Sequence, residues 1–167
     1  MKRLADRINT VVQRIGDGFT WTLLILIVMI VVQVTLRYGF GKSMVYLEEL
    51  HWVLYAMGML VGIAYAIPSD SHIRADLLHQ RLSRRQKAII EIVGVLLFLI
   101  PFFGALGWHG WAFTTAAFRL GENSSSTAGL HQLWLIKMFI PIACLLVLTA
   151  AVAKLINCIS DLKPTHA

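Results

Sequence analysis

The chain has few charged residues and few cysteines. Only 14% of its 167 residues are charged and 57% are hydrophobic, whereas a typical soluble domain is about 25% charged. A chain of this length has too little interior volume to hide so many apolar side chains from water, which excludes a soluble globular domain. Cys144 and Cys158 fall on one predicted helix, about 21 Å apart along its axis, and this separation excludes a disulfide between them. The composition therefore predicts a single membrane domain spanning residues 1–167.

The predicted membrane segments lack acidic residues near their centres. Most of their polar side chains lie within about two turns of a segment end, where a long side chain can reach the interface. A proton or ion relay inside this chain is therefore not expected, because such relays need buried ionisable residues. Pro101 and Pro141 hint at helix breaks but have no polar neighbours, unlike the broken helices that hold substrate in secondary transporters. We predict a non-enzymatic chain without catalytic, metal, substrate or cofactor sites.

Four long apolar runs predict four transmembrane helices. A helix needs about 20 residues to cross a hydrocarbon core of ~30 Å, and the runs meet this length at residues 19–38, 46–67, 88–118 and 131–159. Pro101 beside Gly104 predicts a bend in the third run. Apolar residues also recur at helical spacing in residues 3–17 and 72–87, which predicts two amphipathic helices on the membrane surface. The expected fold class is an all-α integral membrane protein.

Basic residues gather on one side of this arrangement. The N-terminal arm, the segment 72–87 and the residues after position 153 hold eleven of the fifteen Lys and Arg. The positive-inside rule then places both termini and the middle segment in the cytoplasm. No basic stripe is interleaved with aromatic residues, so we expect membrane lipids, and no nucleic acid, as the partner of these charges.

Two histidines leave a second class of function open. His51 and His109 are both predicted to lie toward the outer face, and imidazole is a usual axial ligand of haem. A haem-bearing or other membrane anchor of a redox complex is therefore an alternative. The simpler interpretation is that each is an interfacial histidine hydrogen-bonded to a neighbour.

Other polar and small residues suggest contacts between helices. Gly58 and Gly62 form a GxxxG motif, whose spacing lets another helix approach closely. Arg37 ends the first membrane segment, and two adjacent acids, Glu48 and Glu49, open the second. Adjacent residues point about 100° apart on a helix, so only one acid can face Arg37. We expect that partner to be Glu49, which leaves Glu48 for another protein.

The order of these motifs resembles the small membrane subunit, the DctQ-like component, of tripartite ATP-independent periplasmic (TRAP) transporters. The resemblance covers nearly the whole chain. The motifs that carry it are Arg37-Tyr38, Glu48-Glu49, Gly62, the stretch from His72 through Asp76 to Leu78, Gly121-Glu122, Ser126-Thr127, Leu133-Trp134 and Ile140-Pro141. The sequence departs from the family at Leu130-His131-Gln132, where the family often has Gly-Ile-Pro.

The resemblance implies a complex of three components in the bacterial inner membrane. A periplasmic substrate-binding protein captures an organic acid or similar solute, a large membrane subunit moves it with sodium, and the small subunit scaffolds the large one and helps dock the binding protein. Weaker alternatives are a self-contained small transporter and a membrane-embedded assembly factor. The expected structural or partner-interface residues are Arg37, Glu48, Glu49, Gly58, Gly62, His72, Asp76, Glu122, Trp134 and Lys137.

Overall fold

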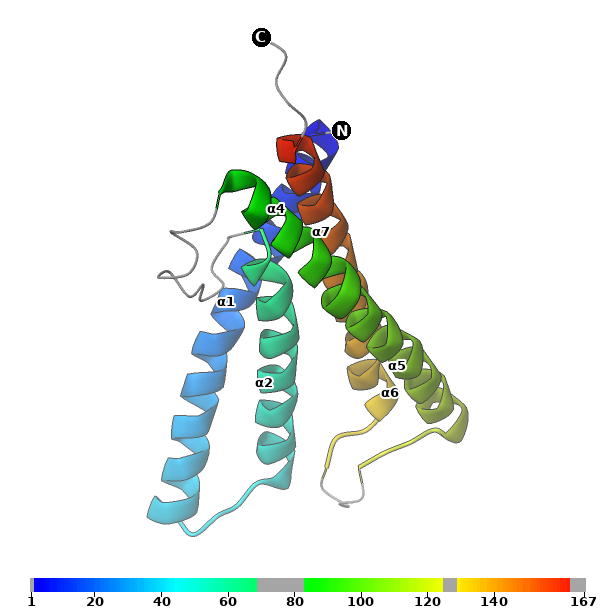
Figure 1. Ribbon diagram of the computed structural model, residues 1–167. Coiled ribbons are helices and arrows are strands. Elements are labelled where there is room, and N and C mark those ends of the chain that lie inside the picture. The colour runs from blue at the N-terminus through cyan, green and yellow to red at the C-terminus, as the bar shows by residue number, and fades with distance from the viewer. Residues whose placement is uncertain (1, 69–82, 125–128, 163–167) are drawn as a thin grey trace.

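The computed structural model describes residues 2–68, 83–124 and 129–162, and all regular structure in these ranges is helical. The elements are α1 (Lys2–Gly39), α2 (Val45–Ala66), α4 (Arg84–Gly94), η1 (Val95–Leu99), α5 (Ile100–Leu120), α6 (Leu133–Lys137) and α7 (Phe139–Leu162) (Figure 1). Four helical stretches are long and apolar enough to cross a membrane: Arg3–Gly39, Val45–Ala66, Arg85–Leu120 and Leu133–Ser160. The predicted fold class, an all-α membrane protein with four spanning helices, is confirmed.

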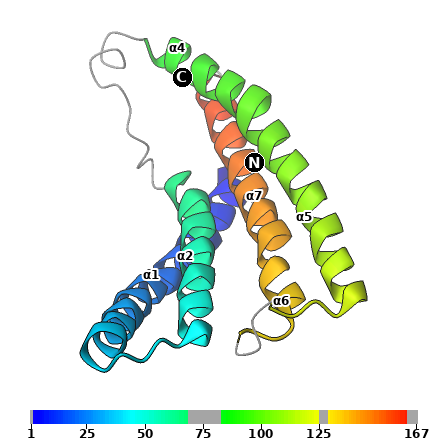
Figure 2. The same cartoon turned by 90° about the horizontal axis from the view of Figure 1, so that it is seen from below.

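Helix α7 is the centre of the packing. Helices α1 and α2 run antiparallel and pack against each other and against α7, and α5 packs on α7 as well. Figure 2 shows α7 between α2 and α5. Ala143, Ala150 and Ala153 of α7 are each at most 1% exposed, because helix backbones approach closely where side chains are small. The core cluster consists of Val12, Ala64, Ile67, Phe103, Cys144, Val147 and Ala150.

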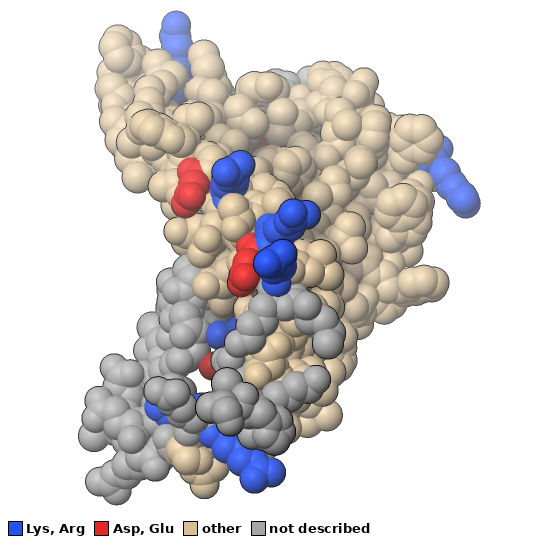
Figure 3. Space-filling model, turned by 90° about the horizontal axis from the view of Figure 1, so that it is seen from above, with Lys and Arg blue, Asp and Glu red and all other residues tan. Residues whose placement is uncertain are grey.

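Most large apolar side chains lie on the outside of the molecule. In the most apolar stretch of each spanning helix, the buried share of residues ranges from 6% in the third helix to 28% in the fourth. A soluble monomer does not expose apolar surface on this scale, so lipid is the natural solvent of these faces. The charged side chains stand out at the end where α1 begins and α7 finishes, which we call the terminal end (Figure 3). The opposite end, which carries residues 40–44, 121–124 and 129–132, is called the loop end.

One boundary suggested by the sequence is not a break in the structure. The expected surface helix over residues 3–17 and the first membrane segment over 19–38 form one continuous helix, α1. Gly16 lies directly against α2, since a Cβ atom there would collide with the ring of Tyr65. Val12 is 1% exposed and belongs to the core cluster, so the N-terminal turns pack as part of the bundle. Their position at the membrane surface stays a prediction.

The second expected surface segment is described only at its end. Residues 72–82 lie outside the described ranges, and α4 begins directly after Ser83. The Gln86 backbone N–H donates to Ser83 Oγ at 3.3 Å, and the Ser83 backbone N–H donates to Gln86 Oε1 at 2.9 Å. This reciprocal capping box satisfies two donors that would otherwise be free and fixes the start of the helix.

Prolines shape the third and fourth spanning helices. The third continues through α4, η1 and α5, and its irregularity is the π turn of η1, which lies directly before Pro101. A proline ring collides with the carbonyl four residues earlier in a regular helix, and a widened turn relieves that collision. In the fourth helix Pro141 has no N–H to offer the carbonyl of Lys137, the residue at which α6 ends. The expected single helix over 131–159 is therefore divided into α6 and α7.

Candidate functional site: the hydrogen-bonded segment at the loop end

The segment that joins α5 to α6 folds back on itself. Gly121 ends α5 in the left-handed conformation at φ 58°, which glycine adopts without strain. Beyond it, the Ser124 N–H donates to the Leu130 carbonyl at 3.0 Å and the Leu133 N–H donates to the Glu122 carbonyl at 3.1 Å. These bonds hold the two described parts of the segment, residues 121–124 and 129–132, side by side. The described part of the segment is therefore a preformed surface at the loop end.

Glu49 ties this segment to α2. Its Oε1 accepts a hydrogen bond from Ser124 Oγ, and its Oε2 accepts one from the Leu130 N–H at 2.6 Å. Both carboxylate oxygens are thus used, and the predicted ion pair between Glu49 and Arg37 is wrong. The guanidinium of Arg37 instead lies 6.0 Å from the centre of the Tyr38 ring. The physical reason is that the returning segment places two donors against the helix that carries Glu49.

An ion pair joins the segment to α6. Lys137 Nζ lies 2.5 Å from Glu122 Oε2 and 3.8 Å from the centre of the Phe113 ring. The Lys137 side chain is only 14% exposed, and a buried ammonium needs a counter-charge or an aromatic face. Trp134 packs edge-on against Phe118 with ring centres 5.1 Å apart. The structure thus brings two of the expected residues, Glu122 and Lys137, into direct contact.

A cleft of about 470 Å³ lies between α2, this segment and α6. Glu49 and the Glu122–Lys137 pair belong to its wall, so both charged groups that order the segment also face this cleft. Its lining residues are Glu49, Trp52, Val53, Glu122, Asn123, Ser124, Leu130, Leu133, Ile136 and Lys137.

The chain's departure from the family pattern has a structural counterpart at Gln132. This residue adopts φ 58°, and it is the only non-glycine residue with positive φ in the described part of the chain. Its backbone N–H donates to Asn123 Oδ1 at 2.9 Å. A proline could adopt neither the angle nor the bond. The start of the fourth helix is therefore built around Gln132, at a position where the family often has proline.

Only one glycine of the predicted GxxxG motif lies at a contact between helices. A Cβ atom at Gly58 would lie 3.4 Å from Leu23 of α1, whereas nothing lies within 4 Å of one at Gly62. Two glycines of α5 lie closer to a neighbouring helix than Gly58 does. A Cβ at Gly110 would lie 2.8 Å from Ile140, and one at Gly107 would lie 3.2 Å from Cys144. The sequence analysis missed these glycines, although their spacing of three residues was a signal.

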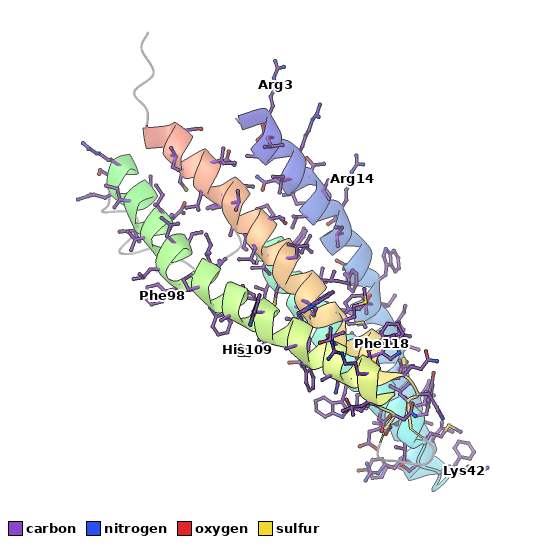
Figure 4. All side chains as sticks on the ribbon, turned by 90° about the vertical axis from the view of Figure 1, so that its right-hand side faces the viewer. Arg3, Arg14, Lys42, Phe98, His109 and Phe118 are labelled. Atoms are coloured by element: carbon purple, nitrogen blue, oxygen red, sulfur yellow. The ribbon has the colours of Figure 1, made fainter. Side chains whose placement is uncertain are left out.

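The remaining expected site residues have no described contact with the loop-end segment. His72 and Asp76 lie outside the described residues. Glu48 lies in the first turn of α2, where the helix dipole favours a negative charge. His109 is exposed and points away from the bundle (Figure 4), while Nδ1 of His51 is buried on α2 without a hydrogen-bond partner. Because α7 lies between α2 and α5, the structure does not bring the two histidines together as haem ligands.

A cluster that the sequence did not indicate lies toward the terminal end, between α4 and α7. Cys158 Sγ lies 3.1 Å from Glu91 Oε2, and Lys154 Nζ lies 3.6 Å from the same oxygen. Glu91 is far in the sequence from Lys154 and Cys158, so no local pattern could have found the cluster. Across the described ranges, no three His, Cys, Asp or Glu residues are grouped so that they could hold a metal ion.

The comparison with protein families covers most of the chain. The family described as tripartite ATP-independent periplasmic transporters, DctQ component, matches residues 26–161. No curated protein matches the chain. The matched residues begin within α1 and reach the last turns of α7, so they include at least part of each of the four spanning helices. They also contain the segment between α5 and α6 with Glu122, together with Glu49 on α2 and Lys137 on α6. This match extends over well more than half of the chain, and the protein belongs to the DctQ component family, the small membrane subunits of TRAP transporters.

Proposed function

We propose that this chain scaffolds the large membrane subunit of a sodium-coupled TRAP transporter in the bacterial inner membrane and helps to dock a periplasmic substrate-binding protein. The solute is an organic acid or a similar small molecule. The observation that carries this proposal is the family match over the part of the chain that forms the four spanning helices. Both termini then face the cytoplasm, as the distribution of Lys and Arg predicts.

The contacts that the charged side chains make support a scaffold role. A transport pathway needs ionisable groups that face a cavity inside the membrane. Within the described ranges, Glu49 and Lys137 line the loop-end cleft, but both are already engaged in contacts that order the loop-end segment. Glu91 contacts Lys154 and Cys158 of α7. These groups hold helices and segments in place.

The loop-end segment supports a docking role. A surface that is already ordered loses less conformational entropy on binding than a flexible one. Here the described part of the segment is bonded internally and is tied to α2 by Glu49 and to α6 by Lys137. A binding protein that approached from the periplasm would meet this end first.

Reconstitution tests the proposal. We expect proteoliposomes with all three components to take up the solute along a sodium gradient. Vesicles that lack this chain should lose uptake, and vesicles with this chain and the binding protein alone should show none. Sodium-driven uptake by the last mixture would contradict the scaffold role. Uptake that is unaffected when this chain is left out would contradict it as well.

A further inference from the structure

Two polar side chains in the apolar contact between α1 and α2 have no hydrogen-bond partner in the described part of the chain. Gln33 of α1 is 7% exposed, and Nδ1 of His51 on α2 is buried. By contrast, the hydroxyl of the buried Thr114 donates to the Gly110 carbonyl at 2.8 Å. Buried polar groups in native proteins are nearly always hydrogen-bonded, and an unpaired one is most costly in an apolar environment. Gln33 and His51 therefore need a partner.

The packing of α1 on α2 places these two residues at nearly the same level. A Cβ atom at Gly58 would lie 3.4 Å from Leu23, so these positions face each other. The two helices run antiparallel. Gln33, which comes ten residues after Leu23, therefore lies opposite the position ten residues before Gly58. His51 is only three residues from that position.

A second contact gives the same register. Gly16 lies against Tyr65, and each of these residues is seven positions from the corresponding residue of the first contact. Leu26 and Gln33, also seven positions apart, are 6% and 7% exposed. Figures 1 and 2 show this half of α1 beside α2 and away from α7. Gln33 is therefore buried against α2.

The direction of the side chains brings the two polar groups toward each other. Three residues along α2 correspond to about 4.5 Å, and His51 is displaced by this amount toward the terminal end. Side chains on an α-helix lean toward its N-terminus, so Gln33 leans toward the terminal end and His51 toward the loop end. The axes of packed helices are about 8–10 Å apart, a gap that a glutamine and a histidine together can span.

The burial of Nδ1 favours a side chain over water as its partner. A water molecule cannot reach an atom that is closed to solvent, whereas the Gln33 amide already lies in the contact between the helices. The last torsion of a glutamine side chain is broad, so turning the amide toward His51 costs little. The amide carries two N–H donors, and a neutral imidazole has one nitrogen that accepts.

We propose that the Gln33 side-chain N–H donates to Nδ1 of His51 and that this bond sets the rotation of α2 that places Glu49 against the loop-end segment. Positions 49 and 51 point about 200° apart on a helix. Glu49 accepts the Leu130 N–H at 2.6 Å on one face of α2, and His51 meets α1 on nearly the opposite face. The first turns of α2 are thus held from both sides. Gln33 and His51 are positioning residues, and this role does not depend on the proposed docking.

Solid-state nuclear magnetic resonance on the full chain in lipid vesicles tests the bond. The histidine rings carry ¹⁵N and the glutamine side-chain amides carry ¹³C, and the dipolar coupling between the two labels is measured. A hydrogen bond places the Gln33 amide carbon about 4 Å from Nδ1. We expect a coupling of this size that disappears in Gln33→Leu and in His51→Phe. Gln13→Leu, on the same helix as Gln33, is the control and should leave it in place.

Hydrogen exchange at the Leu130 amide tests the positioning role. A hydrogen bond between membrane helices contributes a factor of about three on average. We expect Gln33→Leu and His51→Phe each to speed this exchange about threefold. The double variant should exchange no faster than either single one, because both changes remove the same bond.

Two further variants separate the bond from a general loss of packing. His51→Asn keeps a polar acceptor near the place of Nδ1 and should retain slow exchange at Leu130. Thr35→Val, a polar-to-apolar change at an exposed position of α1, is the matched control and should have no effect. An unchanged coupling in Gln33→Leu, unchanged exchange in the single variants, additive acceleration in the double variant, or equal exchange in His51→Asn and His51→Phe would each overturn the proposal.

Discussion

Lys137 shows how one charged side chain is accommodated in an apolar helix. An unpaired ammonium in an apolar environment costs several kcal/mol, and this one is 14% exposed. The Glu122 carboxylate and the face of Phe113 compensate for the lost water. The pair also connects the end of α5 with the start of α6. Its removal should therefore disturb both the charge balance and the loop-end segment.

We expect Lys137→Met to lower the free energy of unfolding by about 1–3 kcal/mol, because Glu122 then loses a charged partner. Thermal unfolding of the detergent-solubilised protein, followed by tryptophan fluorescence, measures the change. Glu122→Gln added to Lys137→Met should recover part of the loss, since the orphaned charge is then gone. Lys42→Met, at an exposed position, serves as control and should have little effect. Equal stability of the Lys137 and Lys42 variants would show that the pair contributes nothing.

Glu49 and Glu48 are adjacent, yet only Glu49 reaches the segment. We expect Glu49→Gln to speed hydrogen exchange at the Leu130 amide, because the carboxylate that accepts this N–H at 2.6 Å is replaced by a weaker acceptor. The Ser124 hydroxyl loses a charged acceptor in the same variant. Exchange measured by mass spectrometry on the fragment that contains Leu130 reports the effect. Glu48→Gln is the matched control, and the prediction fails if both variants exchange alike.

At the level of helices, the sequence predicts the number and length of the spanning segments, because these depend on the composition of long stretches of the chain. Four apolar runs of about 20 residues or more give four spanning helices because a helix is one of the few structures that satisfies its backbone inside lipid. Which residues meet across the helices depends on the path of the loops. Arg37 and Glu49 are at plausible depths to pair, but the returning segment supplies Ser124 and Leu130 instead. Gly16 of α1 lies against Tyr65 of α2, and no local pattern reveals this contact between helices.

The interface between α5 and α7 can be probed with two glycines on one helix. A Cβ at Gly110 would lie 2.8 Å from Ile140, whereas nothing lies within 4 Å of one at Gly104. We expect Gly110→Ala to lower the free energy of unfolding by about 1–3 kcal/mol through overpacking. Gly104→Ala should leave it unchanged or raise it by about 0.5–1 kcal/mol, because alanine favours the helix. Denaturation in a common detergent compares the two, and equal effects would argue against close packing at Gly110.

For the whole molecule, the orientation in the membrane can be tested with cysteines placed at exposed, uncharged positions. We expect Thr10→Cys, at the terminal end, to be protected from an impermeant thiol reagent in intact cells. Ser43→Cys, at the loop end, should react. The native Cys144 and Cys158 are buried, so they contribute little background. Labelling of both variants after the membrane is opened is the control. Reaction at Thr10→Cys with protection at Ser43→Cys would reverse the proposed topology.

The central place of α7 has a consequence for biosynthesis. Chains are made from the N-terminal side, and their parts fold in that order when they can. Here α1 and α2 can pair as soon as both have left the ribosome, but α5 gains its main packing partner only when α7 follows. Until then, small-residue surfaces such as that around Gly110 face lipid or the insertion machinery. A translation product that stops before α7 would consist of two parts without a shared core, and it should be a substrate for membrane proteases.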